Sequence, residues 1–260
     1  MDNVIDRTIY PLPEQEAEAH NKRRMGLGIT GLANAGEMLG KSYASDDFMQ
    51  FMEMVLRNLR DTSYDESCEL AKEKGPFPLW SWEDYSQGKF ILQLPPEIQH
   101  KINTTGIRNS HLTSIAPTGT ISLTADNVSS GIEPPFALYY DRTIEGFDGQ
   151  SIERVEDYAY SLGVKGRTAN EISAEDHVKV LSLAAQYVDS AVSKTCNVGD
   201  DVTFDEFKDL YYNAWLNGCK GITTFRAAGK RYGILNEAND NEPKAEACFI
   251  DPDTGQKTCD

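Results

Sequence analysis

The chain has 260 residues, of which 40% are hydrophobic and 25% charged, and its formal net charge is −16. This composition is typical of a globular protein with one large or two ordinary domains, and it excludes a disordered chain. The negative charge argues against binding to the backbone of DNA or RNA, which requires basic patches, but one loop can still hold a small nucleotide. No run of about 18 apolar residues and no signal-peptide pattern occur, so we expect no membrane span and a cytoplasmic location.

The first half of the chain is predicted to be mainly helical. Residues 14–24 form a charged helix, and residues 45–74 form a long helix with Ser45 as its N-cap and Gly75 at its end. Residues 76–110 have an irregular pattern rich in proline and aromatic residues. The predicted apolar stripe of the long helix consists of Phe48, Met52, Val55 and Leu59.

The second half of the chain alternates strands and helices, which predicts an α/β fold. The expected strands are 111–116, 194–198 and 220–225. Between them we expect a helix at 174–193 capped by Ser173, and a second helix that begins at the capping box Thr203–Glu206. The predicted core face of this second helix consists of Phe207, Leu210, Tyr211 and Ala214.

Two regions differ in composition. Residues 1–236 are predicted to fold as one domain, and the polar residues 237–260 are predicted to be a flexible tail. The tail contains two of the five cysteines, which stand at positions 68, 196, 219, 248 and 259. Their odd number and scattered spacing do not match a disulfide framework or a metal site, so we expect no metal, and we expect the three cysteines outside the tail to be buried thiols.

Gly26, Gly28 and Gly31 match the spacing of a dinucleotide-binding fingerprint, and Asp46 lies about 20 residues further on, where a ribose-binding acid is expected. Such a fingerprint follows a buried apolar strand, whereas this one follows the basic residues 22–24. We therefore favour a packing role, in which the glycines allow a turn or helix to lie close to a neighbouring segment.

The stretch Asn109–Ser122 carries the strongest functional signal. Its first part is typical of a short strand, and its second part, from Pro117 onward, consists of Pro, Gly and small hydroxyl residues. A glycine-containing turn after a strand leaves backbone N–H groups free to converge on an anion, and the start of a helix adds further N–H groups and its dipole. The alternative is an ordinary turn between a strand and a helix.

Several segments, taken in order, resemble one family. Residues 116–122, followed by 127–134, are similar to the signature of the catalytic subunit of adenosylcobalamin-dependent (class II) ribonucleotide reductases. The resemblance extends over nearly the whole chain, because four other segments agree with the family as well. These are residues 2–6, 23–33, 193–198 and 218–226.

The resemblance implies a fold, a cofactor and a substrate. The fold would be the C-terminal portion of the ten-stranded α/β barrel of the family, and the complete enzyme would use adenosylcobalamin to reduce ribonucleoside di- or triphosphates to 2′-deoxyribonucleotides. Glu133 is either a buried acid near the site or an ordinary loop charge. The residues implied to hold the substrate phosphates are Pro117, Thr118, Gly119, Thr120, Ile121 and Ser122.

The resemblance also implies a redox role for the tail. Similar enzymes use a C-terminal cysteine pair as a mobile arm, which re-reduces a buried active-site disulfide with electrons from thioredoxin or glutaredoxin. Cys248 and Cys259 are the candidates for this pair, and they bracket a segment with turn-forming residues. The alternative is that they are two unpaired thiols.

The radical chemistry of the family requires parts that this sequence lacks. The thiyl-radical cysteine, the Asn-x-Cys-x-Glu motif and the nucleotide-specificity region precede, in the family, the segment that stands here at residues 2–6, and no Asn-x-Cys-x-Glu occurs in the chain. We therefore expect no catalytic residue for the radical step here, and a separate N-terminal chain as partner, without which the protein is inactive. A truncated gene product or an excised piece of a longer protein fits the sequence equally well. A homodimer of the complete enzyme is compatible with the resemblance.

Two alternatives to this function remain. One is a catalytically silent nucleotide-binding fragment, and the other is a fragment of the large subunit of a di-iron (class I) reductase. The di-iron class transfers its radical through adjacent tyrosines in the strand after Gly-x-Lys, where this chain has Thr224 and Phe225. Tyr211 and Tyr212 lie on the preceding helix instead, and Tyr211 is predicted to face the core.

Overall fold

The computed structural model describes residues 1–146, 149–199, 202–226, 248–250 and 257–259. The chain divides into two compact units. The first contains Met1–Leu138 and the segment that starts at Glu156, and the second contains Tyr139–Val155 and the C-terminal strands. No helix of the described residues is both long and apolar enough to cross a membrane.

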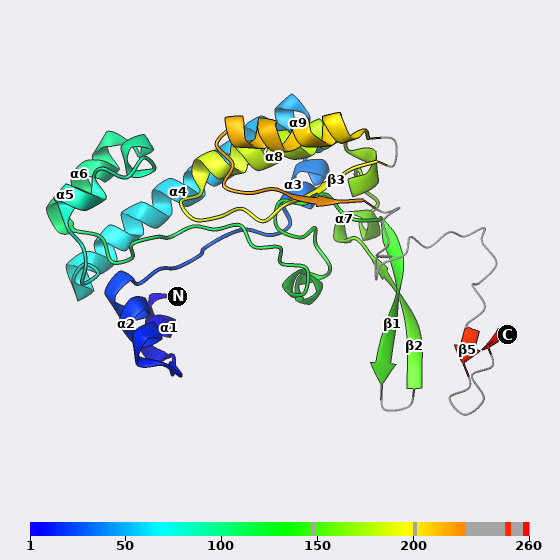
Figure 1. Cartoon of the computed structure of the whole chain (residues 1–260), viewed down its shortest axis with the longest axis horizontal. Helices are drawn as coiled ribbons and strands as arrows, with labels where there is room; N and C mark the ends of the chain where they lie inside the picture. Colours follow the sequence, from blue (N-terminus) through cyan, green and yellow to red (C-terminus); the bar gives the residue numbers. More distant parts are fainter. Residues whose placement is uncertain (147–148, 200–201, 227–247, 251–256, 260) are drawn as a thin grey trace. The chain divides into compact units, whose positions relative to one another are not determined.

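Helices dominate the first unit (Figure 1). Short 3₁₀ turns at Ile91–Gln93, Ile121–Ala125 and Ala169–Glu171 connect some of them. The α-helices are α1 (Asp2–Arg7), α2 (Pro13–Lys22), α3 (Leu32–Met38), α4 (Asp46–Lys74), α5 (Trp82–Tyr85), α6 (Pro96–Thr105), α7 (Tyr158–Ser161), α8 (Ala174–Tyr187) and α9 (Phe204–Leu216).

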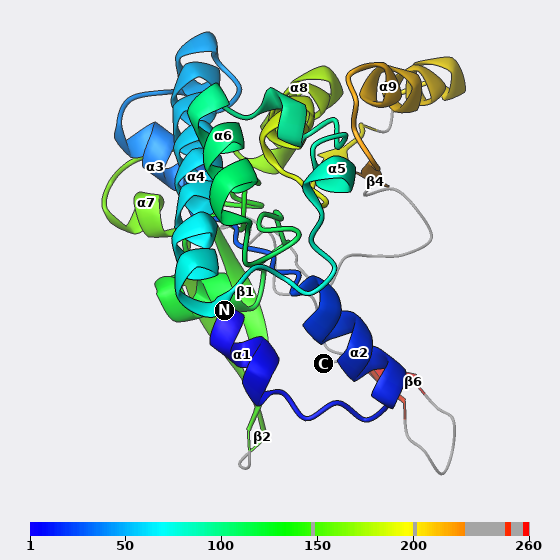
Figure 2. The ribbon, with the colours of Figure 1, turned by 90° about the vertical axis from the view of Figure 1, so that its left-hand side faces the viewer.

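Helix α4 confirms the prediction of a long helix. The Ser45 hydroxyl accepts the N–H of Phe48 at 3.2 Å, and Gly75, with φ of 82°, ends the helix. Phe48 and Met52 are fully buried, whereas Val55 and Leu59 are only partly buried. Helix α6 lies beside α4 in both views (Figure 1 and Figure 2), and α8 packs against α4 as well, so α4 joins two apolar clusters of the unit.

Four extended segments lie side by side in parallel. Leu27 bridges Thr113, and Ile115 bridges Val192. Three residues after Val192, β3 (Thr195–Asn197) begins, and it pairs with β4 (Thr223–Phe225). The predicted strands at 194–198 and 220–225 are thus confirmed, with shorter bounds, whereas 111–116 forms isolated bridges rather than a continuous strand. This order of parallel segments, with helices on the chain between them, is an α/β arrangement and matches an open part of a barrel wall.

Helix α8 ends at Tyr187, six residues before its predicted end. The reason is a long-range contact, because the Asp189 carboxylate accepts the N–H groups of Leu112 (2.6 Å) and Thr113 (3.1 Å). The N–H of Asp189 in turn donates to the Thr113 hydroxyl at 3.0 Å. Residues after Tyr187 therefore join the parallel segments and leave the helix.

The predicted capping box of α9 is present, with the N–H of Thr203 donating to Glu206 at 2.8 Å. Leu210 and Ala214 are buried as predicted. The prediction that Tyr211 faces the core is wrong, since this residue is 40% exposed. Its hydroxyl lies 3.1 Å from that of Thr224, so Tyr211 lies on the flank of α9 beside β4.

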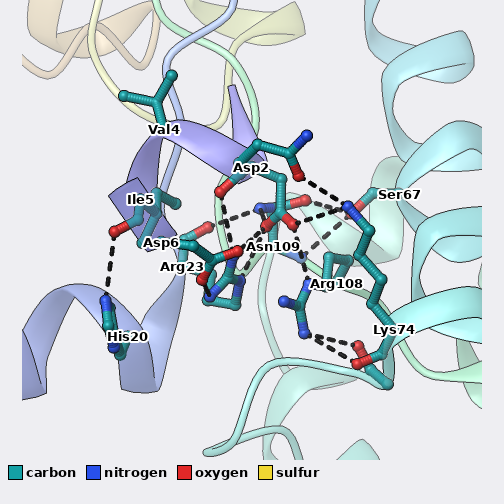
Figure 3. A network of polar contacts seen from close by, with 12 residues as sticks. Asp2, Val4, Ile5, Asp6, His20, Arg23, Ser67, Lys74, Arg108 and Asn109 are labelled. Atoms are coloured by element: carbon teal, nitrogen blue, oxygen red, sulfur yellow. Dashed lines mark hydrogen bonds and ion pairs between the residues drawn. The ribbon is translucent and has the colours of Figure 1, made fainter. Parts of the chain in front are cut away.

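A buried polar network fixes the N-terminal segment (Figure 3). The Asp2 carboxylate accepts from Arg23 (2.8 Å), Arg108 (3.2 Å) and the side-chain amide of Asn109 (3.1 Å). Arg23 also donates to Asp6 at 2.8 Å, and it has a positive φ of 49° at the end of α2. The segments 2–6 and 23–33 of the family resemblance therefore meet here, through the bonds of Arg23 to Asp2 and Asp6.

The second unit contains two pairs of strands. β1 (Tyr139–Gly146) and β2 (Gly149–Glu156) form one two-stranded sheet, which the sequence did not predict. β5 (Cys248–Ile250) and β6 (Lys257–Cys259) form an antiparallel pair in which Cys248 stands opposite Cys259. The rest of the predicted tail, 237–260, lies outside the described residues.

Candidate phosphate-binding site

The three glycines of the fingerprint-like segment serve close packing. A Cβ on Gly26 would lie 2.4 Å from the hydroxyl oxygen of Ser114, and a Cβ on Gly28 would lie 2.3 Å from its carbonyl oxygen. Gly31 has a φ of 77° at the start of α3. The glycines thus let this segment run directly alongside Thr113 and Ser114, which is the packing role favoured from the sequence.

The predicted phosphate loop, Pro117–Ser122, follows the bridged segment that ends at Ile115. Thr118 has a φ of 54°, the left-handed conformation that β-branched residues rarely adopt, whereas Thr120 is in the right-handed helical region. The N–H of Ser122 donates to the carbonyl of Thr118 at 2.9 Å, and the Ser122 hydroxyl donates to that of Gly119 at 3.2 Å. These bonds close the loop at the start of the 3₁₀ turn Ile121–Ala125.

A second segment braces the loop from behind. The N–H of Gly131 donates to the Thr118 hydroxyl oxygen at 2.7 Å, and the hydroxyls of Ser122 and Ser130 lie 3.3 Å apart. The Thr30 hydroxyl also lies 2.9 Å from that of Thr118. The Thr118 side chain is therefore engaged within the protein, which accounts for its strained backbone.

The outer side of the loop presents hydrogen-bond donors. Among the described residues, the backbone N–H groups of Thr118, Gly119 and Thr120 have no acceptor. Gly119 and Thr120 are exposed, and a Cβ placed on Gly119 would meet no atom within 4 Å. Successive N–H groups with left- and right-handed conformations nearby form the kind of concavity that binds anions.

The six predicted residues thus have different positions. Ser122 is buried and uses both its N–H and its hydroxyl inside the loop, so its place is structural. Pro117 is exposed and has no N–H, and Ile121, at 59% exposure, offers apolar surface beside the open donors. The open donor groups come from the central residues of the loop.

A buried ion pair lies behind the bracing segment. The ammonium group of Lys194, whose side chain is 1% exposed, donates to Glu133 at 2.6 Å and to Nδ1 of His177 at 2.9 Å. The other Glu133 oxygen accepts the N–H of Thr195 at 2.5 Å. Glu133 is thus a partly buried acid and not an ordinary loop charge, and Lys194 is a residue that the sequence analysis did not single out.

Burial shifts the pKa values of His177 and Lys194. Burial, reinforced by the positive charge of Lys194, lowers the pKa of His177 to about 3. His177 is therefore neutral, accepts from Lys194 at Nδ1 and carries its proton on Nε2, which lies 3.2 Å from the carbonyl oxygen of Ala169. Burial also lowers the pKa of Lys194, although Glu133 opposes this shift.

The three described cysteines of the first unit are free thiols that differ in burial. Cys68 and Cys196 are buried free thiols, and burial raises the pKa of each to about 11. Cys219 is half-buried, with its sulfur 3.4 Å from the Ser182 hydroxyl. No group of three or more His, Cys, Asp or Glu side chains in the described residues is arranged to bind a metal ion.

Two features bear on the predicted radical and redox residues. Strand β4 carries Thr224 and Phe225, the two residues that the sequence analysis compares with the adjacent tyrosines of the di-iron class. In the tail, the register of β5 and β6 sets the backbones of Cys248 and Cys259 opposite each other despite the residues between them.

Comparisons with known proteins agree with this architecture. The family model described as "Ribonucleotide reductase, barrel domain" matches residues 1–225. A vitamin B12-dependent ribonucleoside-diphosphate reductase of Mycobacterium tuberculosis is 31% identical over 92% of this chain and 36% of its own length. One from Thermoplasma acidophilum is 30% identical over 95% of this chain and 34% of its own, and a ribonucleoside-diphosphate reductase subunit alpha of Treponema pallidum is 26% identical over 87% and 27%.

The chain therefore spans about a third of the length of the first two relatives. The matched residues 1–225 include the four parallel segments, the predicted phosphate loop and its bracing segment. The fold and the family resemblance inferred from the sequence are thus confirmed. The chain belongs to the ribonucleotide reductase barrel-domain family.

Proposed function

We propose that this chain supplies the substrate-phosphate site and the reducing tail of a cobalamin-dependent ribonucleotide reductase, which converts ribonucleoside di- or triphosphates to 2′-deoxyribonucleotides. The observation that carries the proposal is the open row of N–H groups at Thr118, Gly119 and Thr120. It lies in the segment that resembles the phosphate loop of the family. The names of the relatives, which are ribonucleoside-diphosphate reductases, support the same substrate class.

The loop binds phosphate through neutral donors. No lysine or arginine occurs between Arg108 and Arg142, so the phosphate oxygens accept hydrogen bonds from backbone N–H groups and from the Thr120 hydroxyl. Backbone donors held in a fixed conformation need no reorganisation when the ligand arrives. The fixed conformation comes from the bonds of Ser122 and Gly131 to the loop.

The radical step belongs to residues outside this chain. The 260 residues contain no Asn-x-Cys-x-Glu motif, so the thiyl-radical cysteine and its neighbouring acid come from an N-terminal part, as a separate chain or as a longer form of the same polypeptide. On its own the chain binds the substrate phosphates and does not reduce the ribose. The proposal places the complete enzyme in the cytoplasm as a homodimer.

Adenosylcobalamin, when bound to the complete enzyme, supplies the radical. The open groups of the loop are N–H and hydroxyl donors, which suit an anion and not a corrin ring. We therefore assign no residue of this chain to the cofactor. The role of the loop is to hold the ribonucleotide by its phosphates, so that the ribose stays in one position during the reaction.

The tail returns electrons after each turnover. Reduction of the ribose leaves an active-site disulfide, and the thiols of Cys248 and Cys259 reduce it by exchange, forming a disulfide between themselves. Thioredoxin or glutaredoxin then reduces that disulfide with two electrons. The register of β5 and β6, which sets the two backbones opposite each other, supports the pairing.

Substitution of Gly119 tests the phosphate role. A Cβ at this position meets no protein atom within 4 Å, so Gly119→Val leaves the free protein stable but fills the space of the ligand. We expect binding of the nucleotide CDP to weaken about tenfold or more, with an unchanged free energy of unfolding. Gly221→Val is the matched control, because a Cβ there also meets open space. Equal CDP affinity of Gly119→Val and the unmodified chain would rule out the phosphate role.

A further inference from the structure

The buried lysine behind the phosphate loop has no part in the proposed binding contacts. Lys194 begins the run into β3, and its ammonium group is satisfied three times, by Glu133, by His177 and by the carbonyl of Thr195 at 3.2 Å. It also lies 5.7 Å from the centre of the Tyr43 ring. A buried charge is costly unless it is fully paired, so this complete pairing calls for an explanation.

The partner of Lys194 belongs to the segment that braces the loop. The N–H of Glu133 donates to the carbonyl of Ser130 at 2.8 Å, which closes a turn around Gly131. Gly131 has a φ of 55°, and a Cβ there would lie 2.8 Å from the carbonyl oxygen of Ala116. The turn therefore packs closely against the backbone of Ala116, directly before the phosphate loop begins.

The turn is held on both sides. On one side, Asn34 accepts the N–H of Ser129 at 2.6 Å, and the N–H of Gly31 donates to the carbonyl of Ser129 at 2.7 Å. On the other side, the Tyr43 hydroxyl donates to the carbonyl of Ile132 at 2.6 Å, and Lys194 holds Glu133. Of these four contacts with the turn, the one between Lys194 and Glu133 is an ion pair, and the other three are hydrogen bonds between neutral groups.

We propose that Lys194 is a positioning residue of the phosphate loop, acting through Glu133 on the turn that holds Thr118. The path has three steps: Lys194 fixes the Glu133 carboxylate, Glu133 fixes the turn 130–133, and Gly131 in that turn donates to the Thr118 hydroxyl oxygen. Lys194 also neutralises the Glu133 carboxylate, whose charge would otherwise be unpaired near the turn. The inference rests on the proposed function of the loop.

The test uses the full chain, labelled with ¹⁵N and titrated with inorganic pyrophosphate while the amide signal of Gly119 is followed. The signal reports only folded molecules, so a loss of stability alone does not change the measured affinity. In the unmodified chain we expect the Gly119 signal to shift and saturate. In Lys194→Met we expect the affinity for pyrophosphate to fall about tenfold.

Two other variants complete the test. Glu133→Gln should weaken binding to a similar extent, and the double variant should bind no more weakly than either single variant, because both remove the same contact. Lys179→Met is the matched control. Lys179 lies on α8 and loses the same charge, but it pairs with the exposed Asp46 at 3.2 Å. Its affinity should equal that of the unmodified chain.

The outcomes separate the two proposals. If Gly119 of the unmodified chain does not respond to pyrophosphate, the proposed loop function fails, and this inference fails with it. If the unmodified chain binds and Lys194→Met binds equally well, only the positioning role of Lys194 is overturned. Should Lys194→Met not fold, as judged by circular dichroism, Glu133→Gln decides in the same way, because it keeps the shape of the side chain.

Discussion

The guanidinium group of Arg23 donates to the carboxylate of Asp2 at 2.8 Å, and both side chains are 5% exposed. Arg108 and Asn109 donate to the same carboxylate, so Asp2 ties α1 to two segments of the chain. Removing Asp2 leaves the buried Arg23 with Asp6 as its remaining carboxylate partner and takes away the carboxylate partner of Arg108. We expect Asp2→Ala to lower the free energy of unfolding in urea by about 3 kcal/mol. Asp46→Ala, at an exposed ion pair, should change it by less than about 1 kcal/mol.

The same network predicts how stability depends on pH. Burial of Asp2 favours its neutral form, but Arg23 and Arg108 outweigh burial and lower its pKa. A lowered pKa in the folded state stabilises the protein fully above the ordinary carboxyl pKa of about 4, and this stabilisation is lost as the pH falls through the lowered value. Urea unfolding between pH 5 and pH 2 should show a steeper loss in the unmodified chain than in Asp2→Asn. Parallel curves would contradict the assignment.

The close approach of Gly28 to Ser114 predicts a strong effect of a single methyl group. Gly28→Ala places a Cβ 2.3 Å from a backbone oxygen, which cannot move without displacing the bridged segment. We expect a loss of about 2 kcal/mol or more in the free energy of unfolding, as is usual for overpacking. Gly119→Ala, which meets open space, should leave stability unchanged and serves as the control.

Removing the Thr118 hydroxyl without changing the shape of the side chain tests how much this hydroxyl stabilises the protein. Thr118→Val keeps the β-branched form but removes the nearer of two acceptors of the Gly131 N–H, which then keeps only the longer bond to the Thr30 hydroxyl at 3.1 Å. Loss of the shorter bond should reduce the free energy of unfolding by about 1 kcal/mol and weaken phosphate binding. Thr124→Val is the comparison, because the Thr124 hydroxyl donates only to Ile121 on an exposed turn. Equal stability of the two variants would mean that the brace does not depend on this hydroxyl.

The proposed role of the tail cysteines predicts that the effect of their substitution on turnover depends on the reductant. In the complete enzyme, Cys248→Ser should abolish turnover with thioredoxin but spare turnover with dithiothreitol, a small dithiol that can reach a buried disulfide directly. Cys259→Ser should behave alike, and Cys219→Ser should keep activity with both reductants. Turnover measured as deoxyribonucleotide formed decides between the cases, and equal loss with both reductants would exclude a shuttle role for Cys248.

Local signals in the sequence predicted α2, α4, α8 and α9, because the causes of these helices act over a few residues. Ser45 contacts the N–H three residues later, and the capping box of Thr203 spans the same distance. The expectation that residues 76–110 are irregular was wrong, because α5 and α6 lie there. The predicted end of α8 was wrong because the Asp189 carboxylate accepts the N–H of Leu112, which is far away in the chain. Hydrophobic spacing on α9 likewise could not show that Tyr211 lies beside Thr224.

The candidate site was found in the sequence only as far as the loop itself. Pro117–Ser122 has a recognisable composition, but the division between open donors and structural groups depends on the partners of the loop. The pair of Lys194 and Glu133 is separated by 61 residues, and each side chain alone has no special pattern. The resemblance implied a phosphate-binding role for Ser122, whereas its bonds to Thr118 and Gly119 show that it closes the loop.

Among the described residues, the set of parallel segments has two edges at which backbone N–H and C=O groups have no neighbouring strand. Among the residues that the structure describes, no further strand pairs with the outer side of the segment at Leu27 or with the outer side of β4. An unpaired edge is a template for another strand, so a complementing polypeptide could add to this wall by edge-to-edge pairing. In the isolated chain the same edges would promote self-association, which should increase with protein concentration.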